Sequence, residues 1–216
     1  MERDNKYAVD IIKDHFPKGL IIFILIVSSA ILYAGYQFYQ AEVEQTRSQK
    51  ETTLASIASL KVNQITDWYL DELFDANVIT QNSILREAAI RYTQNATAAD
   101  SSSIVMMMKQ IKEEHDYADI FMTTMDGHIL VGTSSVISSI DSIELLGIER
   151  ASQKGGSVST DLFRTDYGEE RRIFITFISA IYDDNRLPIV AMVYRFDSDQ
   201  YLYPLIESWP VPSHTS

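Results

Sequence analysis

The chain has 216 residues, of which 18 are Lys or Arg and 30 are Asp or Glu, and its formal net charge is −12. This balance argues against nucleic acid as a partner, because binding to phosphates requires a basic surface. The chain has no cysteine, which excludes disulfides, thiolate metal ligands and a cysteine nucleophile.

The first expected element is a transmembrane helix over residues 19–39. Its core, Leu20 to Gly35, contains no charged residue, and aromatic residues extend it to the length of about 20 residues that a spanning helix needs. Basic residues precede this run and none follows it before Arg47, so the charge bias places residues 1–18 in the cytoplasm. Residues 40–216 are then expected outside the cell membrane, with the chain crossing the bilayer once.

A cleaved signal peptide is the alternative interpretation of this apolar run. Such a leader carries net positive charge and ends in a small-residue cleavage site. Here residues 1–18 carry equal numbers of acidic and basic residues, and no Ala-x-Ala closes the run. An uncleaved anchor fits the sequence better.

Residues 40–99 are expected to form a stalk that continues the membrane helix outward. Between Ala41 and Asn95 there is neither proline nor glycine. Apolar residues recur at intervals of three and four, which predicts one long amphipathic helix or two nearly collinear ones. The recurring positions are Leu54, Ala58, Val62, Ile65, Tyr69, Leu73 and Ala76. This stripe packs on the chain's own lobe, pairs with a second copy in a homodimer, or does both.

Residues 100–209 are expected to form a single α+β lobe. A helix is predicted from Asp100 to Lys112, a short helix over 145–152, and a last helix from a cap at residues 197–199 through Trp209. Alternation and turn signals such as Asp126-Gly127 predict a five-stranded antiparallel sheet. The expected strands are residues 117–125, 128–133, 157–163, 172–182 and 188–196.

Two stretches resemble a known family. Residues 57–82, IASLKVNQITDWYLDELFDANVITQN, resemble the first long helix of the double Cache (PDC) domain in prokaryotic PAS-containing sensor histidine kinases. Residues 196–213, FDSDQYLYPLIESWPVPS, are similar to the segment that leaves the membrane-distal, PAS-like lobe of that domain. The resemblance implies that residues 210–216 begin an interlobe linker. It also implies that a full-length parent continues into a second lobe, a second membrane helix and a histidine kinase.

The sequence offers no evidence of catalysis in the chain as it stands. None of the histidines, which are His15, His115, His128 and His214, lies in the phosphoacceptor context of that family or has the spacing of a metal site. There is no glycine-rich phosphate loop and no Gly-x-Ser-x-Gly elbow. We therefore expect no catalytic residue, no metal, no phosphoacceptor and no cofactor.

The resemblance implies a ligand pocket between the sheet and the short helix before the third strand. Arg164 is the candidate for holding a carboxylate, because a guanidinium can form two parallel hydrogen bonds with it. A solvated turn arginine paired with Asp166 is the alternative. Thr176, Tyr117 and Tyr182 are further candidates, each with an ordinary structural interpretation. The Arg-x-Trp-Tyr arrangement of amino-acid-binding relatives is absent, so the ligand stays unknown, with a small carboxylate as one possibility.

The expected function is therefore small-molecule sensing outside the membrane by a receptor of the histidine kinase type. Ligand state would pass through the stalk helix to the membrane. The ectodomain of a methyl-accepting chemoreceptor and a non-sensing, membrane-anchored display protein are the alternatives.

Overall fold

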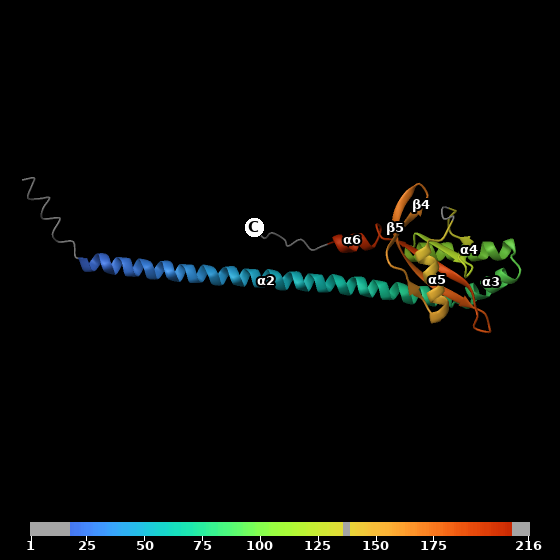
Figure 1. Cartoon of the computed structure of the whole chain (residues 1–216), viewed down its shortest axis with the longest axis horizontal. Coiled ribbons are helices and arrows are strands. Elements are labelled where there is room, and N and C mark those ends of the chain that lie inside the picture. The colour runs from blue at the N-terminus through green and yellow to red at the C-terminus, as the bar shows by residue number, and fades with distance from the viewer. Residues whose placement is uncertain (1–17, 136–138, 209–216) are drawn as a thin grey trace, which may run out of the picture. The chain divides into compact units, whose positions relative to one another are not determined.

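The computed structural model describes residues 18–135 and 139–208 of the chain. These residues form a very long helix followed by an α+β lobe (Figure 1). The elements are α2 (Lys18–Thr80), α3 (Ser83–Gln94), α4 (Ala98–His115), β1 (Asp119–Thr123), β2 (Ile129–Gly132), α5 (Ser142–Lys154), β3 (Val158–Ser159), β4 (Phe163–Tyr167), β5 (Glu170–Tyr182), β6 (Pro188–Asp197) and α6 (Leu202–Glu207). The chain divides into two compact units, residues 1–58 and residues 59–216.

Helix α2 is continuous over 63 residues, so the stalk does continue the apolar segment as one helix as far as Thr80. Its first part contains an 18-residue window with a mean hydropathy of 2.2 and no buried side chain, so the segment is long and apolar enough to cross a bilayer. The stalk region contains two helices and not one, because α3 begins after a break at Gln81 and Asn82. Asn82 caps α3, because its side-chain oxygen accepts hydrogen bonds from the backbone of Ile84 and Leu85.

The sheet of the lobe has the order β2-β1-β6-β5-β3, with β4 also paired to β5, and each pair is antiparallel. Strand β5 is long enough to pair with β4 over its first residues and with β3 at Phe177 and Ile178, further along the strand. Helix α2 packs on one face, where the Ser179 hydroxyl donates to the Ala76 carbonyl. Helix α5 packs on the other, where the Tyr182 hydroxyl donates to the Ala151 carbonyl.

The α+β class and antiparallel sheet are confirmed, but the predicted third strand over 157–163 differs in detail. It contains only the short β3, and the chain then leaves the sheet at Asp161 and Leu162 before β4 begins. Gly168, with φ of +65°, closes a tight β4–β5 hairpin. The sheet therefore has six strands in place of five.

An aromatic cluster joins α2 to the sheet. The indole of Trp68 meets the rings of Phe177 and Phe196 edge to face, at centroid distances of 6.1 and 5.5 Å, and stacks on Tyr201 at 5.1 Å. Such pairs stabilise a core beyond the area that they bury. The C-terminal half of α2 is therefore an integral part of the lobe.

Candidate functional site

The candidate site is built around α5, which the sequence anchors at both ends. Asp141 and Glu144 form a capping box at its start, and Gly155 ends it in the left-handed conformation with φ of +73°. Gly147 lets the helix approach the sheet closely, because a Cβ there would lie 2.6 Å from Cδ1 of Ile178. Helix α5 thus has a fixed start, a fixed end and a close contact in the middle.

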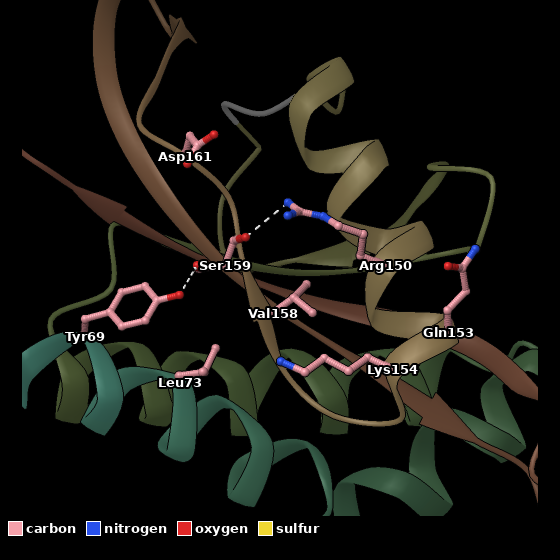
Figure 2. A pocket seen from close by; sticks show the side chains of 8 residues that line it. All are labelled: Tyr69, Leu73, Arg150, Gln153, Lys154, Val158, Ser159 and Asp161. Atoms are coloured by element: carbon pink, nitrogen blue, oxygen red, sulfur yellow. Dashed lines mark hydrogen bonds between the residues drawn. The ribbon is translucent and has the colours of Figure 1, made fainter. Parts of the chain in front are cut away.

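A cleft of about 560 Å³ lies where the C-terminal half of α5 meets strand β3 and helix α2 (Figure 2). It is open to solvent and has walls from three elements. Its lining residues are Tyr69, Leu73, Arg150, Gln153, Lys154, Val158, Ser159 and Asp161.

The polar groups of the cleft converge on β3. Arg150 donates to the Ser159 carbonyl at 3.1 Å, and the hydroxyls of Tyr69 and Ser159 are 2.6 Å apart. Lys154 extends from α5 towards α2, while Asp161 stands at the other end of the opening (Figure 2). In a strongly acidic chain, this cleft therefore carries two cationic side chains against one carboxylate.

Under the N-terminal half of α5 lies a fully buried ion pair. Arg195 of β6 donates to both carboxylate oxygens of Glu144, at 2.7 and 2.5 Å, and both side chains are at most 1% exposed. The guanidinium lies 5.0 and 5.5 Å from the ring centroids of Phe121 and Phe174. A buried, bidentate and ring-flanked arginine of this kind holds α5 to the sheet.

Thr176 belongs to this buried cluster. Its hydroxyl donates to Glu144 at 3.1 Å, and its backbone N–H donates to the hydroxyl of Thr160. Thr176 therefore faces α5, the short helix before the third strand. In this structure, however, the hydroxyl is bonded within the protein and is shielded from solvent.

Arg164 lies on β4 with an exposed side chain, and it is not among the residues that line the cleft. The alternative pairing with Asp166 is not found either, because Asp166 forms its ion pair with Arg171 at 3.2 Å. Arg164 and Thr176 are therefore not brought together, and a role of Arg164 in ligand binding stays a prediction.

The two tyrosines that the sequence singled out lie apart from each other. Tyr117 packs on the α2 side, and its hydroxyl donates to Glu72 at 3.2 Å. Burial raises the pKa of its phenol strongly, so Tyr117 acts as a donor. Tyr182 lies at the end of β5 and donates to the last turn of α5, through the carbonyls of Ala151 and Ser152.

Sequence reasoning missed the charged residues of both clusters. Arg150 and Lys154 lie among other polar residues of a short helix, and no local pattern distinguishes them from solvent-exposed charges. Arg195 carried a usable signal, since it is the one charged residue in the apolar run from Ile189 to Phe196. Its partner Glu144, 51 residues earlier, could not be identified from local pattern.

The sequence matches no family model and no curated protein. Solved structures do match. The ligand-binding domain of the Campylobacter jejuni chemoreceptor Tlp3, in complex with L-norvaline, is 12% identical with a TM-score of 0.57; the match covers 72% of this chain and 61% of that one. The sensor domain of the V. cholerae histidine kinase DctB is 14% identical with a TM-score of 0.54, over 81% of this chain and 62% of that one.

This chain therefore spans about three fifths of the length of these two domains. Both are sensor domains and neither is a catalytic domain. With identities this low, the likeness concerns the fold, and it extends over the long helix and the antiparallel sheet. The chain has the fold of the PDC or Cache type of ligand-binding sensor domain, as found in chemoreceptors and histidine kinases.

Proposed function

We propose that this chain is the small-molecule-sensing input of a transmembrane receptor of the histidine kinase type. The observation that carries the proposal is the position of the cleft, which is walled by α5, β3 and α2 together. A molecule bound there touches the helix that leads to the apolar segment. The chain itself is not an enzyme, and its full-length parent is a histidine kinase.

The ligand is a small anion, with a carboxylate as the leading class. Arg150 and Lys154 supply the positive charge, and the hydroxyl pair of Tyr69 and Ser159 supplies neutral hydrogen bonds. An arginine that already donates to the Ser159 carbonyl is held in place, which reduces the entropy that binding costs. A charge-assisted hydrogen bond to a carboxylate is stronger than a neutral one.

Helix α5 is the element whose position the ligand biases. Arg150 and Lys154 lie on the same helix as Glu144, which is bonded to Arg195 of the sheet. A ligand shifts the equilibrium between two positions of α5 only by its difference in affinity for them. The contact between Tyr69 and Ser159 then passes the change in β3 to α2.

The remaining parts of the proposal concern the membrane and a second copy. The apolar part of α2 lies in the lipid bilayer of the cell membrane, with the N-terminus in the cytoplasm and the lobe outside. Leu70, Phe74 and Val78, spaced by four along α2, are 53%, 66% and 50% exposed. This apolar row is the surface through which two stalks pair as a homodimer.

The chemoreceptor alternative is supported by the likeness to the Tlp3 domain and shares the same sensing lobe. The two alternatives differ only in the cytoplasmic part that the parent carries. A display protein, in contrast, would hold the same lobe without responding to any small molecule.

The experiment is a thermal-shift screen of the full chain in lipid nanodiscs with acetate, lactate, succinate, citrate and a set of amino acids. A ligand at one hundred times its Kd stabilises the folded state by about 2.7 kcal/mol. Arg150→Ala and Lys154→Ala are expected to abolish the shift. Arg164→Ala is the matched control, because it also removes an exposed cation from the lobe but lies outside the cleft.

A shift that disappears with Arg164→Ala and persists with Arg150→Ala would move the site to Arg164, the residue that the sequence predicted. No shift with any compound would favour the display protein.

A further inference from the structure

A second cluster of polar side chains lies on the other side of the lobe from α5. Glu72 and Asp75 are three positions apart on α2 and so lie on one face of that helix. His115, the last residue of α4, lies beside them. One ligand atom of each residue lies within 4.8 Å of the other two. All three side chains are half-buried, so they are held by packing but remain within reach of an ion.

The spacing of the cluster fits a transition-metal ion. Two ligands on a tetrahedral zinc ion, each about 2.1 Å from it, lie roughly 3.4 Å apart. Nδ1 of His115 and Oδ2 of Asp75 are 3.5 Å apart, so these two atoms already stand at that separation. The Glu72 oxygen has to come closer to the other two ligand atoms by at most about 1.4 Å to complete the set, because all three atoms lie within 4.8 Å of one another.

The charge of the cluster also calls for a cation. Glu72 and Asp75 are both half-buried, which makes an unpaired negative charge on either of them costly. Within the described parts of the chain, neither Glu72 nor Asp75 forms an ion pair with a lysine or arginine. Two carboxylates and one imidazole thus face one another with no permanent positive charge between them.

The groups around the cluster orient its ligands. The Tyr117 hydroxyl donates to Oε2 of Glu72 at 3.2 Å, which leaves the other oxygen available to an ion. The ring of Tyr117 stacks on the imidazole of His115 at a centroid distance of 5.6 Å and so fixes its plane. Outer groups of this kind are typical of metal sites.

An unpartnered donor adjoins the same place. Trp68 is 8% exposed, and its indole N–H has no hydrogen-bond partner among the described residues. Trp68 lies four positions before Glu72 on α2, so the two side chains are neighbours on one face of the helix. A buried N–H without a partner is costly, so a polar group beside this indole is favoured.

We propose that Glu72, Asp75 and His115 form a site for a divalent transition-metal ion of the zinc class, with water as the fourth ligand. An imidazole among the ligands favours zinc over magnesium or calcium, which prefer oxygen ligands alone. The bound ion ties α2 to the end of α4 and so stiffens the part of the stalk helix that lies within the lobe. This inference does not depend on the proposed ligand cleft, with which it shares no residue.

The test uses the full chain in lipid nanodiscs after treatment with a chelator. Zinc is titrated against a competing chromophoric chelator, and metal per protein is measured by elemental analysis. We expect one zinc ion per chain and a zinc-dependent rise in Tm of the wild type, since an ion that binds only the folded state stabilises it. Cobalt(II) in place of zinc is expected to give the visible absorption of a tetrahedral site.

The variants Glu72→Gln, Asp75→Asn and His115→Asn are expected to weaken zinc binding by more than tenfold. Tyr117→Phe, which removes only the group that orients Glu72, is expected to weaken it by about tenfold. His128→Asn is the matched control, because His128 also faces an aspartate, Asp126, at 3.4 Å but is 83% exposed.

Failure of the wild type to bind one equivalent of zinc would overturn the proposal, whatever the variants do. Equal zinc affinity in wild type and Glu72→Gln would overturn it too, as would magnesium binding as tightly as zinc. Because the wild-type measurements need no substitution, a variant that fails to fold leaves the proposal testable. The outcome of the thermal-shift screen with small-molecule ligands does not affect the interpretation of the zinc titration.

Discussion

Removal of the charge of Glu144 is expected to destabilise the lobe severely. Glu144→Gln keeps the size of the side chain and its acceptor for the Asp141 backbone N–H, so the cap of α5 survives. What is lost is the negative charge opposite the guanidinium of Arg195, which is 1% exposed and bonded twice to this carboxylate. Removing one partner of a buried ion pair costs about 3–5 kcal/mol, since the other charge stays buried without compensation.

The assay is urea unfolding of the full chain in nanodiscs, followed by tryptophan fluorescence because Trp68 packs against the sheet. Asp166→Asn is the control. It removes one charge from the pair with Arg171, whose side chains are 81% and 70% exposed, and should cost less than about 1 kcal/mol.

The double variant Glu144→Leu with Arg195→Met should recover part of the stability, because an apolar pair of similar size can replace a buried ion pair, although a leucine no longer accepts from the Asp141 N–H and the Thr176 hydroxyl. A loss for Glu144→Gln no larger than that for Asp166→Asn would refute the reasoning.

Three further substitutions test the packing of α5 by the same unfolding assay. Gly147→Val should destabilise by about 1–3 kcal/mol, because even a Cβ at this position would lie 2.6 Å from Ile178; Leu146→Val on the exposed face of the helix is the control, and an equal loss would contradict the close contact. Tyr182→Phe should cost about 1 kcal/mol through the lost bonds to the end of α5, without changing ligand affinity; a selective loss of affinity would restore Tyr182 as a ligand residue. Asp141→Ala should cost about 1 kcal/mol by removing the cap, and no change would show that the capping box contributes nothing.

The parts of the fold that the sequence predicts are those with a long, regular pattern. Helix α2 and strands β5 and β6 have continuous apolar periods, and their existence and type were predicted. The bounds of the two strands were predicted to within about two residues, whereas the end of α2 at Thr80 was not predicted. Strand β4 was missed because charged residues occupy every second position of its short sequence, FRTDY. The Gly168 and Glu169 that follow are typical of a loop. Its pairing depends on the unusual length of β5, which is a property of the tertiary structure.

The candidate site was predictable only in its position along the fold. The short helix before the third strand was expected to cover the pocket, and α5 does border the cleft. Arg164 was preferred to Arg150 because it follows a predicted strand. The sequence pattern could not show that the side chain of Arg164 is exposed and lies outside the cleft. Glu72 and Asp75 have the spacing of one helix face, but His115 is 40 or more positions away and joins them only through packing of α4 on α2.

The two proposed sites lie on the same stretch of α2, and this makes a coupling between them measurable. Tyr69 belongs to the cleft, whereas Glu72 and Asp75 belong to the proposed metal site. All three lie within two turns of α2. If the ligand and zinc each favour one position of this stretch, each must change the affinity of the other by the same factor.

Ligand affinity is therefore to be measured in the nanodisc-bound chain with saturating zinc and with chelator, and zinc affinity with and without ligand. If zinc changes the ligand affinity, and the ligand changes the zinc affinity by the same factor, both sites act on α2. Factors of one in both directions would show that the sites act independently, which would leave the contact between Tyr69 and Ser159 as the route from the cleft to the stalk helix.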